Sequence, residues 1–162
     1  MKEIGKDIKY KKRVRLKDFN YKGYNRYFVT ICTNNNKNLF INKDLIDWLI
    51  SELKEISNKH HFNIWAYCFM PDHLHLLTEG NDEEADMRKF IAAFKQKTGF
   101  LYKKKFNNQL WEINYYEHVL RKEETIKEVA FYIFNNPLRK GIVKNYQEYP
   151  YSGSFMFDIN DY

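Results

Sequence analysis

The sequence predicts an α+β protein with a ferredoxin-like, split βαβ arrangement, in which an antiparallel sheet carries two helices on one face. A further C-terminal helix, which bears a tyrosine, is added to this core. Two observations predict this fold class. Strand-like and helix-like segments follow one another in the order strand, helix, strand, strand, helix, strand, helix. No internal repeat or low-complexity linker divides the 162 residues, so we expect a single domain.

The first strand and the first helix are predicted from residue types and from the signals at their ends. Residues 27–33 (YFVTICT) are rich in β-branched and aromatic side chains, and three asparagines follow them. Between residues 45 and 56, apolar residues recur at helical spacing behind Asn42 and Asp44, which suit a helix N-terminus. We therefore expect a strand over 27–33 and then a helix that ends near His60.

Two more strands and a second helix follow. Residues 62–70 and 73–78 are strand-like runs separated by Pro71 and Asp72, which predicts a tight hairpin or a bulged continuation. Apolar residues at helical spacing between positions 87 and 101 predict the second helix, whose other faces are rich in lysine and arginine.

The C-terminal part predicts one more strand and one more helix. Residues 110–120 favour a strand, and residues 123–135 favour a helix. Pro137 should end this helix, because proline disfavours helical backbone at the residue before it.

Charge and composition favour a polyanionic partner and exclude several classes of protein. Lys and Arg outnumber Asp and Glu by 27 to 21, and eight of these basic residues lie in the first 17 positions. This stretch is either a basic arm that binds a partner or a solvated tail. The two cysteines, Cys32 and Cys68, lack the spacing of a zinc site or a disulfide framework. With no signal-peptide pattern and no apolar stretch of bilayer length, we expect a cytoplasmic protein without a membrane segment.

A pair of histidines is the first candidate for chemistry. His73 and His75 are two positions apart in a predicted strand, so both side chains point to the same face. Two adjacent imidazoles can ligate one divalent cation, although two ligands alone make a poor site. The alternative is that two ordinary strand positions happen to be histidine.

A tyrosine and an asparagine on the third predicted helix are the second candidate. Tyr132 and Asn136 are four positions apart, and they flank the helix's apolar stripe. The alternative is that Tyr132 packs against the sheet while Asn136 caps the helix before Pro137. If the helix meets the histidines, two imidazoles and an amide oxygen would hold a divalent ion beside a tyrosine nucleophile.

The chain resembles the HUH single-tyrosine transposases of the small insertion-sequence type, and within them the REP-associated tyrosine transposases. The segments that carry this resemblance run in family order along nearly the whole chain: residues 27–33, 70–77, 110–111, 115–121, 132–137, 141–143 and 149–152. The resemblance implies a basic arm over residues 1–20, one HUH transposase domain over 21–157 and a tail over 158–162.

The resemblance also implies a reaction and a set of roles. The expected activity is cleavage and rejoining of single-stranded DNA through a 5′-phosphotyrosine intermediate, with single-stranded or hairpin DNA as the partner. The implied metal ligands are His73, His75 and Asn136, the metal is Mg²⁺ or Mn²⁺, and the implied nucleophile is Tyr132. Relatives act as monomers or as homodimers, so both states stay open.

Other interpretations compete with this one. A non-cutting regulatory protein on the same scaffold would bind hairpins but would not need all four of these residues. RNA binding through a sheet of the RRM type would predict an aromatic RNP1-like strand, which the sequence lacks. Tyr115 and Tyr116 are further nucleophile candidates on chemistry alone, while Glu117 and His118 are best interpreted as structural.

Overall fold

The sheet is built around the hairpin predicted at Pro71 and Asp72. The computed structural model describes residues 16–161. In this part of the chain the sheet has five antiparallel strands: β1 (Arg26–Cys32), β2 (Phe62–Met70), β3 (His73–Gly80), β4 (Tyr116–Val119) and β5 (Ser152–Gly153). Their order is β4-β1-β3-β2-β5, which places β3 at the centre.

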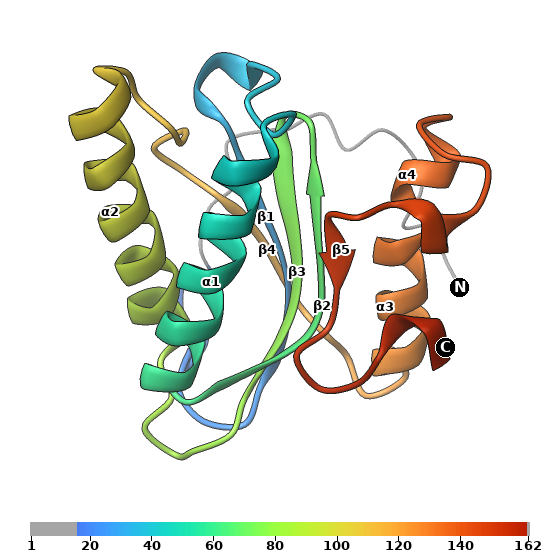
Figure 1. Ribbon diagram of the computed structural model, residues 1–162. Helices are drawn as coiled ribbons and strands as arrows, with labels where there is room; N and C mark the ends of the chain where they lie inside the picture. The colour runs from blue at the N-terminus through green and yellow to red at the C-terminus, as the bar shows by residue number, and fades with distance from the viewer. Residues whose placement is uncertain (1–15, 162) are drawn as a thin grey trace.

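Two long helices cover one face of this sheet (Figure 1). They are α1 (Lys43–Lys59) and α2 (Met87–Phe106). Each begins at a capping side chain: Asn42 accepts a hydrogen bond from the backbone N–H of Leu45, and Asp86 accepts one from Lys89. Their apolar stripes pack on the strand residues that point toward them and form the larger of the two buried clusters.

The third helix lies on the opposite face, together with a short fourth helix (Figure 1). They are α3 (Ile126–Phe134) and α4 (Asn136–Arg139). A reciprocal capping box between Thr125 and Glu128 starts α3. Its buried residues, Val129 and Ala130 among them, pack on the other side of the strands and form the smaller cluster. The predicted α+β fold with an added tyrosine-bearing helix is therefore confirmed.

Two details of the prediction were wrong. The strand expected over residues 110–120 is confined to 116–119, because α2 side chains hold the preceding segment. The indole of Trp111 donates to Thr98 Oγ1 at 2.8 Å, and Lys95 Nζ donates to the carbonyls of Glu112 and Ile113, both at 2.8 Å. These bonds take the place of a sheet ladder, apart from an isolated bridge between Trp111 and Thr33.

The helix α3 ends before Pro137 as predicted, at Phe134, but the residue before the proline is helical, which the prediction excluded. The backbone of Asn135 is helical (φ −79°, ψ −6°), and α4 follows at once with Pro137 in its first turn. A proline is tolerated there because the first N–H groups of a helix have no intrahelical acceptor. Asn135, and not Asn136, is thus the residue at the end of α3.

Short turns and the chain ends make up the rest of the described residues. Three 3₁₀ turns complete the secondary structure: η1 (Asn34–Asn36), η2 (Tyr146–Glu148) and η3 (Ile159–Asp161). Most of the expected basic arm, residues 1–15, lies outside the described residues. Phe19, which the prediction assigned to the arm, packs edge-on against Tyr21 with ring centroids 5.0 Å apart. Over residues 16–161, every helix is too short or too polar to cross a membrane.

Candidate functional site

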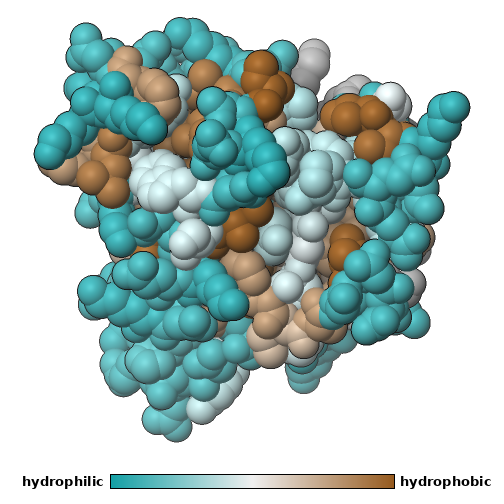
Figure 2. Space-filling view, viewed as in Figure 1, coloured by the Kyte–Doolittle hydropathy of each residue, from teal (hydrophilic) through white to brown (hydrophobic). Residues whose placement is uncertain are grey.

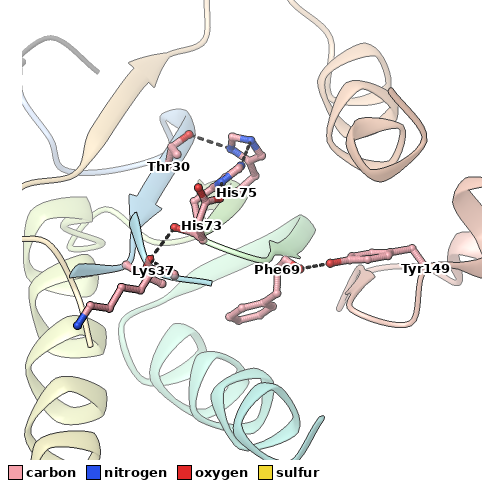
Figure 3. Close-up of polar contacts among 8 residues, drawn as sticks. Thr30, Lys37, Phe69, His73, His75 and Tyr149 are labelled. Carbon is pink, nitrogen blue, oxygen red and sulfur yellow. Dashed lines mark hydrogen bonds and ion pairs between the residues drawn. The ribbon is translucent and has the colours of Figure 1, made fainter. Parts of the chain in front are cut away.

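The two histidines lie on the face of the sheet that α3 covers. In β3, the side chains of Leu74 and Leu76 join the cluster under α1 and α2, so His73 and His75 point to the other face. Both imidazoles are buried, with 9% and 8% of their surface exposed. Their Nε2 atoms are 3.0 Å apart (Figure 3). The alternation seen in the sequence therefore brings the two nitrogens to a single point.

Each histidine is held through its other nitrogen. Nδ1 of His73 is 2.6 Å from Oδ1 of Asp72. Nδ1 of His75 is 2.8 Å from Oγ1 of Thr30 (Figure 3). A carboxylate only accepts, so His73 carries its proton on Nδ1 and presents a lone pair at Nε2. The Thr30 hydroxyl both donates and accepts, so His75 can take either neutral tautomer. When His75 donates to Thr30, both Nε2 lone pairs face the same point.

The surroundings of His75 favour its neutral form, which is the form that can bind a metal ion. Burial holds the pKa of His75 well below its usual range, and the positive charges of Arg139 and Lys140 add to this effect. The hydrogen bond with His73 lowers the pKa of Asp72. His75 is thus neutral at physiological pH, which leaves a nitrogen lone pair available to a cation.

Tyr132 reaches this site through one intervening ring. The ring of Phe28 stacks on His75 with centroids 5.2 Å apart, and Tyr132 meets the same Phe28 edge-on at 6.0 Å. Tyr132 is half-buried. The guanidinium carbon of Arg139 lies 4.0 Å from the centroid of the Tyr132 ring, within cation–π range. The predicted nucleophile is therefore a neighbour of the histidine pair within the same chain.

Asn136 is buried at the start of α4, with 3% of its surface exposed. Its Oδ1 atom accepts a hydrogen bond from Arg139 Nη2 at 3.4 Å. Among the hydrogen bonds of the described residues, none joins Asn136 to His73 or His75. Arg139 therefore connects Asn136 with Tyr132, and the amide oxygen is engaged by the guanidinium.

The chain is similar to known proteins in sequence and in fold. The family model described as "Transposase IS200 like" matches residues 21–136. The chain belongs to this transposase family. A Haemophilus influenzae protein assigned to the REP-associated tyrosine transposases is 29% identical over 144 residues, which cover 82% of this chain and 81% of the relative. The REP-associated tyrosine transposase of Escherichia coli is 26% identical over 102 residues, which cover 60% of this chain and 58% of the relative.

A solved structure supports the same assignment of fold. A REP-associated tyrosine transposase bound to a REP hairpin matches with a TM-score of 0.70 at 20% identity, over 86% of this chain and 82% of that chain. The resemblance inferred from the sequence is confirmed. At this identity, the structural likeness concerns the fold alone.

The other candidate residues that the sequence offered lie on different faces of the sheet of this transposase. Tyr115 lies against α2, where its hydroxyl is 3.9 Å from the sulfur of Met87, on the face away from the histidines. Tyr116 is directly opposite Thr30 in the sheet and so shares the histidine face. Nε2 of His118 pairs with Glu124 at 2.9 Å, a contact that ties β4 to the turn before α3. Glu117 is buried and accepts a hydrogen bond from Tyr21 on the opposite face.

Sequence reasoning missed three residues at the site of the transposase. Thr30 and Phe28 alternate with apolar residues in β1, but only the strand register shows that Thr30 faces His75. Arg139 is seven positions after Tyr132, which is a helical spacing that could have been noticed. Because Pro137 was expected to end the helix, Arg139 was not considered as a helical neighbour of Tyr132. Across residues 16–161, no group of three or more His, Cys, Asp or Glu side chains forms a metal-sized cluster.

Proposed function

We propose that this transposase cleaves and rejoins single-stranded DNA beside a hairpin, with Tyr132 as nucleophile and a divalent cation bound by His73 and His75. The observation that carries the proposal is the convergence of the two Nε2 atoms at 3.0 Å, while both Nδ1 atoms have protein partners. Outer hydrogen bonds of this kind orient histidine ligands in metal sites. The solved structure of a REP-associated tyrosine transposase bound to a REP hairpin supports DNA hairpins as the partner.

The donor set fits a divalent ion such as Mg²⁺ or Mn²⁺. Two neutral imidazoles supply nitrogen lone pairs, and the amide of Asn136 supplies a neutral oxygen, a donor type that such ions accept. When bound, the ion supplies Lewis-acid polarisation of a phosphoryl oxygen. No third His, Cys, Asp or Glu joins the pair within residues 16–161, so Asn136 is the natural third protein ligand.

Arg139 has two tasks in this proposal. Its guanidinium stacks on Tyr132 and so restricts the direction of the phenol. It also bonds Asn136 Oδ1 at 3.4 Å, a long contact that a phosphate group would readily replace, because Arg binds phosphate oxygens with two parallel hydrogen bonds. Arrival of the DNA phosphate would therefore draw Arg139 toward the substrate and release the amide oxygen of Asn136.

The reaction itself exchanges one phosphoester for another. The Tyr132 oxygen attacks the scissile phosphorus, the bond to the 3′ oxygen breaks, and a 5′-phosphotyrosine forms. The phenolic proton passes to solvent and the leaving 3′ oxygen takes up a proton, so that charge is conserved. The new ester conserves the energy of the broken one, and a 3′ hydroxyl can later reverse the step to rejoin DNA.

The packing of α3 supports a site that is built from a single chain. Phe28 contacts His75 and Tyr132 at the same time, so the helix that carries the tyrosine packs on its own sheet. We infer that cleavage takes place in cis. A mixture of a His75→Ala variant and a Tyr132→Phe variant should then remain inactive, whereas a site shared between subunits would recover activity in mixed dimers.

The test uses a labelled oligonucleotide with a hairpin and single-stranded flanks. With Mg²⁺ or Mn²⁺ the protein should form a covalent adduct that survives denaturing electrophoresis, and EDTA should prevent it. Hairpin binding without any adduct, over a range of metal concentrations and flank sequences, would show a non-cutting hairpin-binding protein instead.

A further inference from the structure

A cleft opens between α1 and α2, on the face of the sheet away from the histidines. Its volume is about 400 Å³, within the range of pockets that hold small molecules. Trp48 and Leu45 of α1 line one side, and Leu101, Tyr102 and Phe106 of α2 line the other. Figure 2 shows brown and near-white side chains gathered between the upper ends of the two helices and bordered by teal ones.

The walls of the cleft are aromatic and partly exposed. The rings of Tyr102 and Phe106 are 4.7 Å apart, and Phe106 keeps 47% of its surface exposed. Trp48 is half-buried on the facing helix. A packed helix pair has no need for an exposed phenylalanine beside an open cleft, whereas an aromatic ring of this kind offers a stacking surface to another flat ring.

Positive charge surrounds the α2 side of the cleft. Lys103, Lys104 and Lys105 occupy the last turn of α2, and none of them forms an ion pair with another described residue. Nζ of Lys105 lies 5.3 Å from the ring centroid of Phe106. Lysines at a helix C-terminus favour the helix dipole, but that interaction accounts for neither the cleft nor the exposed ring. Stacking surfaces beside lysines complement single-stranded nucleic acid.

The start of β3, which carries the histidines, lies at the same end of the sheet as the start of α1 and the end of α2, which line the cleft (Figure 1). The backbone N–H of Phe40 donates to the carbonyl of Pro71 at 2.9 Å, two residues before His73. Only two residues after Phe40, Asn42 lines the cleft. A DNA strand held at the histidines can therefore continue over this end of the sheet to the cleft, without crossing the length of the domain.

We propose that this cleft binds one unpaired base of the DNA strand that flanks the cleavage site. The base lies between Trp48 and Phe106, and Lys105 contacts an adjacent phosphate. Asn42 and Asp44, at the α1 end of the cleft, offer polar atoms to the edge of the base. The proposal rests on the proposed function for the identity of the strand, but binding at the cleft needs neither the metal ion nor Tyr132.

The test measures binding of a short, unstructured single-stranded oligonucleotide. EDTA is present to remove divalent ions, so that the DNA is not cleaved. Base stacking should quench the fluorescence of Trp48, and the Trp48→Phe variant should lose that part of the quenching. Phe106→Leu keeps an apolar side chain without a π-face, and Lys105→Gln removes one charge. Each should weaken binding about 10-fold, the order expected for loss of one stacked base or one phosphate contact. Lys89→Gln, at the exposed start of α2, is the matched control and should bind like the parent.

This binding test and the cleavage assay can fail independently, so failure of the cleft proposal can be distinguished from failure of the proposed function. Quenching by the oligonucleotide in a protein that forms no adduct would support the cleft while the proposed function fails. Parental affinity in both Phe106→Leu and Lys105→Gln, with unchanged melting temperatures, would overturn the cleft proposal even if the adduct forms. If sedimentation shows instead that Phe106→Leu abolishes self-association of the free protein, the cleft is a contact between copies and the proposal is also overturned.

Discussion

The two faces of the sheet share the same strands but carry different kinds of side chain. Toward α1 and α2, β3 presents Leu74 and Leu76, both fully buried in the larger apolar cluster. Toward α3, the same strand presents His73 and His75, and β1 adds Thr30. Because successive residues of a strand point to opposite faces, one strand can serve stability on one side and chemistry on the other.

This difference has an energetic consequence. The face under α1 and α2 is closed by long, capped helices and gains its stability from burial of aliphatic and aromatic side chains. The face under α3 has a smaller apolar cluster and also buries the two histidines, whose hydrogen bonds to Thr30 and Asp72 matter because an unpaired buried polar group costs free energy. Substitutions on the first face should therefore affect unfolding, and substitutions on the second should mainly affect activity.

The largest effect should come from the removal of one oxygen on the α3 face. Tyr132→Phe keeps the ring that packs on Phe28 and under Arg139, so folding and hairpin binding should persist. It removes the proposed attacking atom, so no covalent adduct should be seen on a denaturing gel. Tyr115→Phe and Tyr116→Phe serve as controls and should still form it. An adduct mapped by mass spectrometry to a residue other than Tyr132 would overturn the mechanism.

Loss of one histidine should be nearly as severe. His73→Ala or His75→Ala leaves one imidazole, and several kcal/mol of transition-state stabilisation by the metal would be lost, about 1,000-fold in cleavage rate. Hairpin affinity should largely survive and can be measured by fluorescence anisotropy. Cleavage at the parental rate in saturating Mg²⁺ or Mn²⁺ would refute the metal assignment.

Leu76→Ala tests the opposite face at the position next to His75. Leu76 is fully buried, so its truncation should lower the free energy of unfolding by about 3 kcal/mol, as measured by denaturant titration. The folded fraction should bind the metal with parental affinity, because the side chain points away from the histidines. A metal affinity that falls together with stability would show that the two faces are coupled.

Thr30→Val replaces the hydroxyl beside His75 by a methyl group of similar size. Without this partner, His75 loses the contact that orients its ring and stabilises the ligating tautomer. Metal affinity should fall by about 10-fold, at the lower end of the range for outer-shell substitutions, and Mn²⁺ titration can measure it. Saturating metal should restore cleavage. If excess metal does not rescue the variant, Thr30 acts on something other than ligation.

The smallest effect is expected at Asn136. Asn136→Ala removes the proposed neutral ligand, which water can replace, so cleavage should fall only a few-fold, and mainly at limiting metal. The matched control is Asn135→Ala, which removes a neighbouring amide that donates to the carbonyl of Phe131 at 3.1 Å. Equal behaviour of the two variants at limiting metal would make Asn136 a structural residue.

Local patterns were sufficient to predict much of this protein. The apolar stripes defined α1, α2 and α3, and the alternation of histidine and leucine correctly placed His73 and His75 on one face. The order of motifs along the chain indicated the transposase family that the comparisons then confirmed. These features follow from residue types and short-range periodicity, which are properties of the chain itself.

Only the tertiary structure decided which residues surround the histidines. Thr30 is 45 positions before His75, and no local pattern reveals their register across β1 and β3. Pro137 predicted a helix end by its local preference, and α3 does end at Phe134, yet α4 follows at once and brings Arg139 onto Tyr132. The sequence by itself determined the elements and the chemistry available on each, because steric and hydrophobic periodicity act over a few residues. The arrangement of that chemistry into a site depended on long-range packing, in which residues far apart in the chain meet.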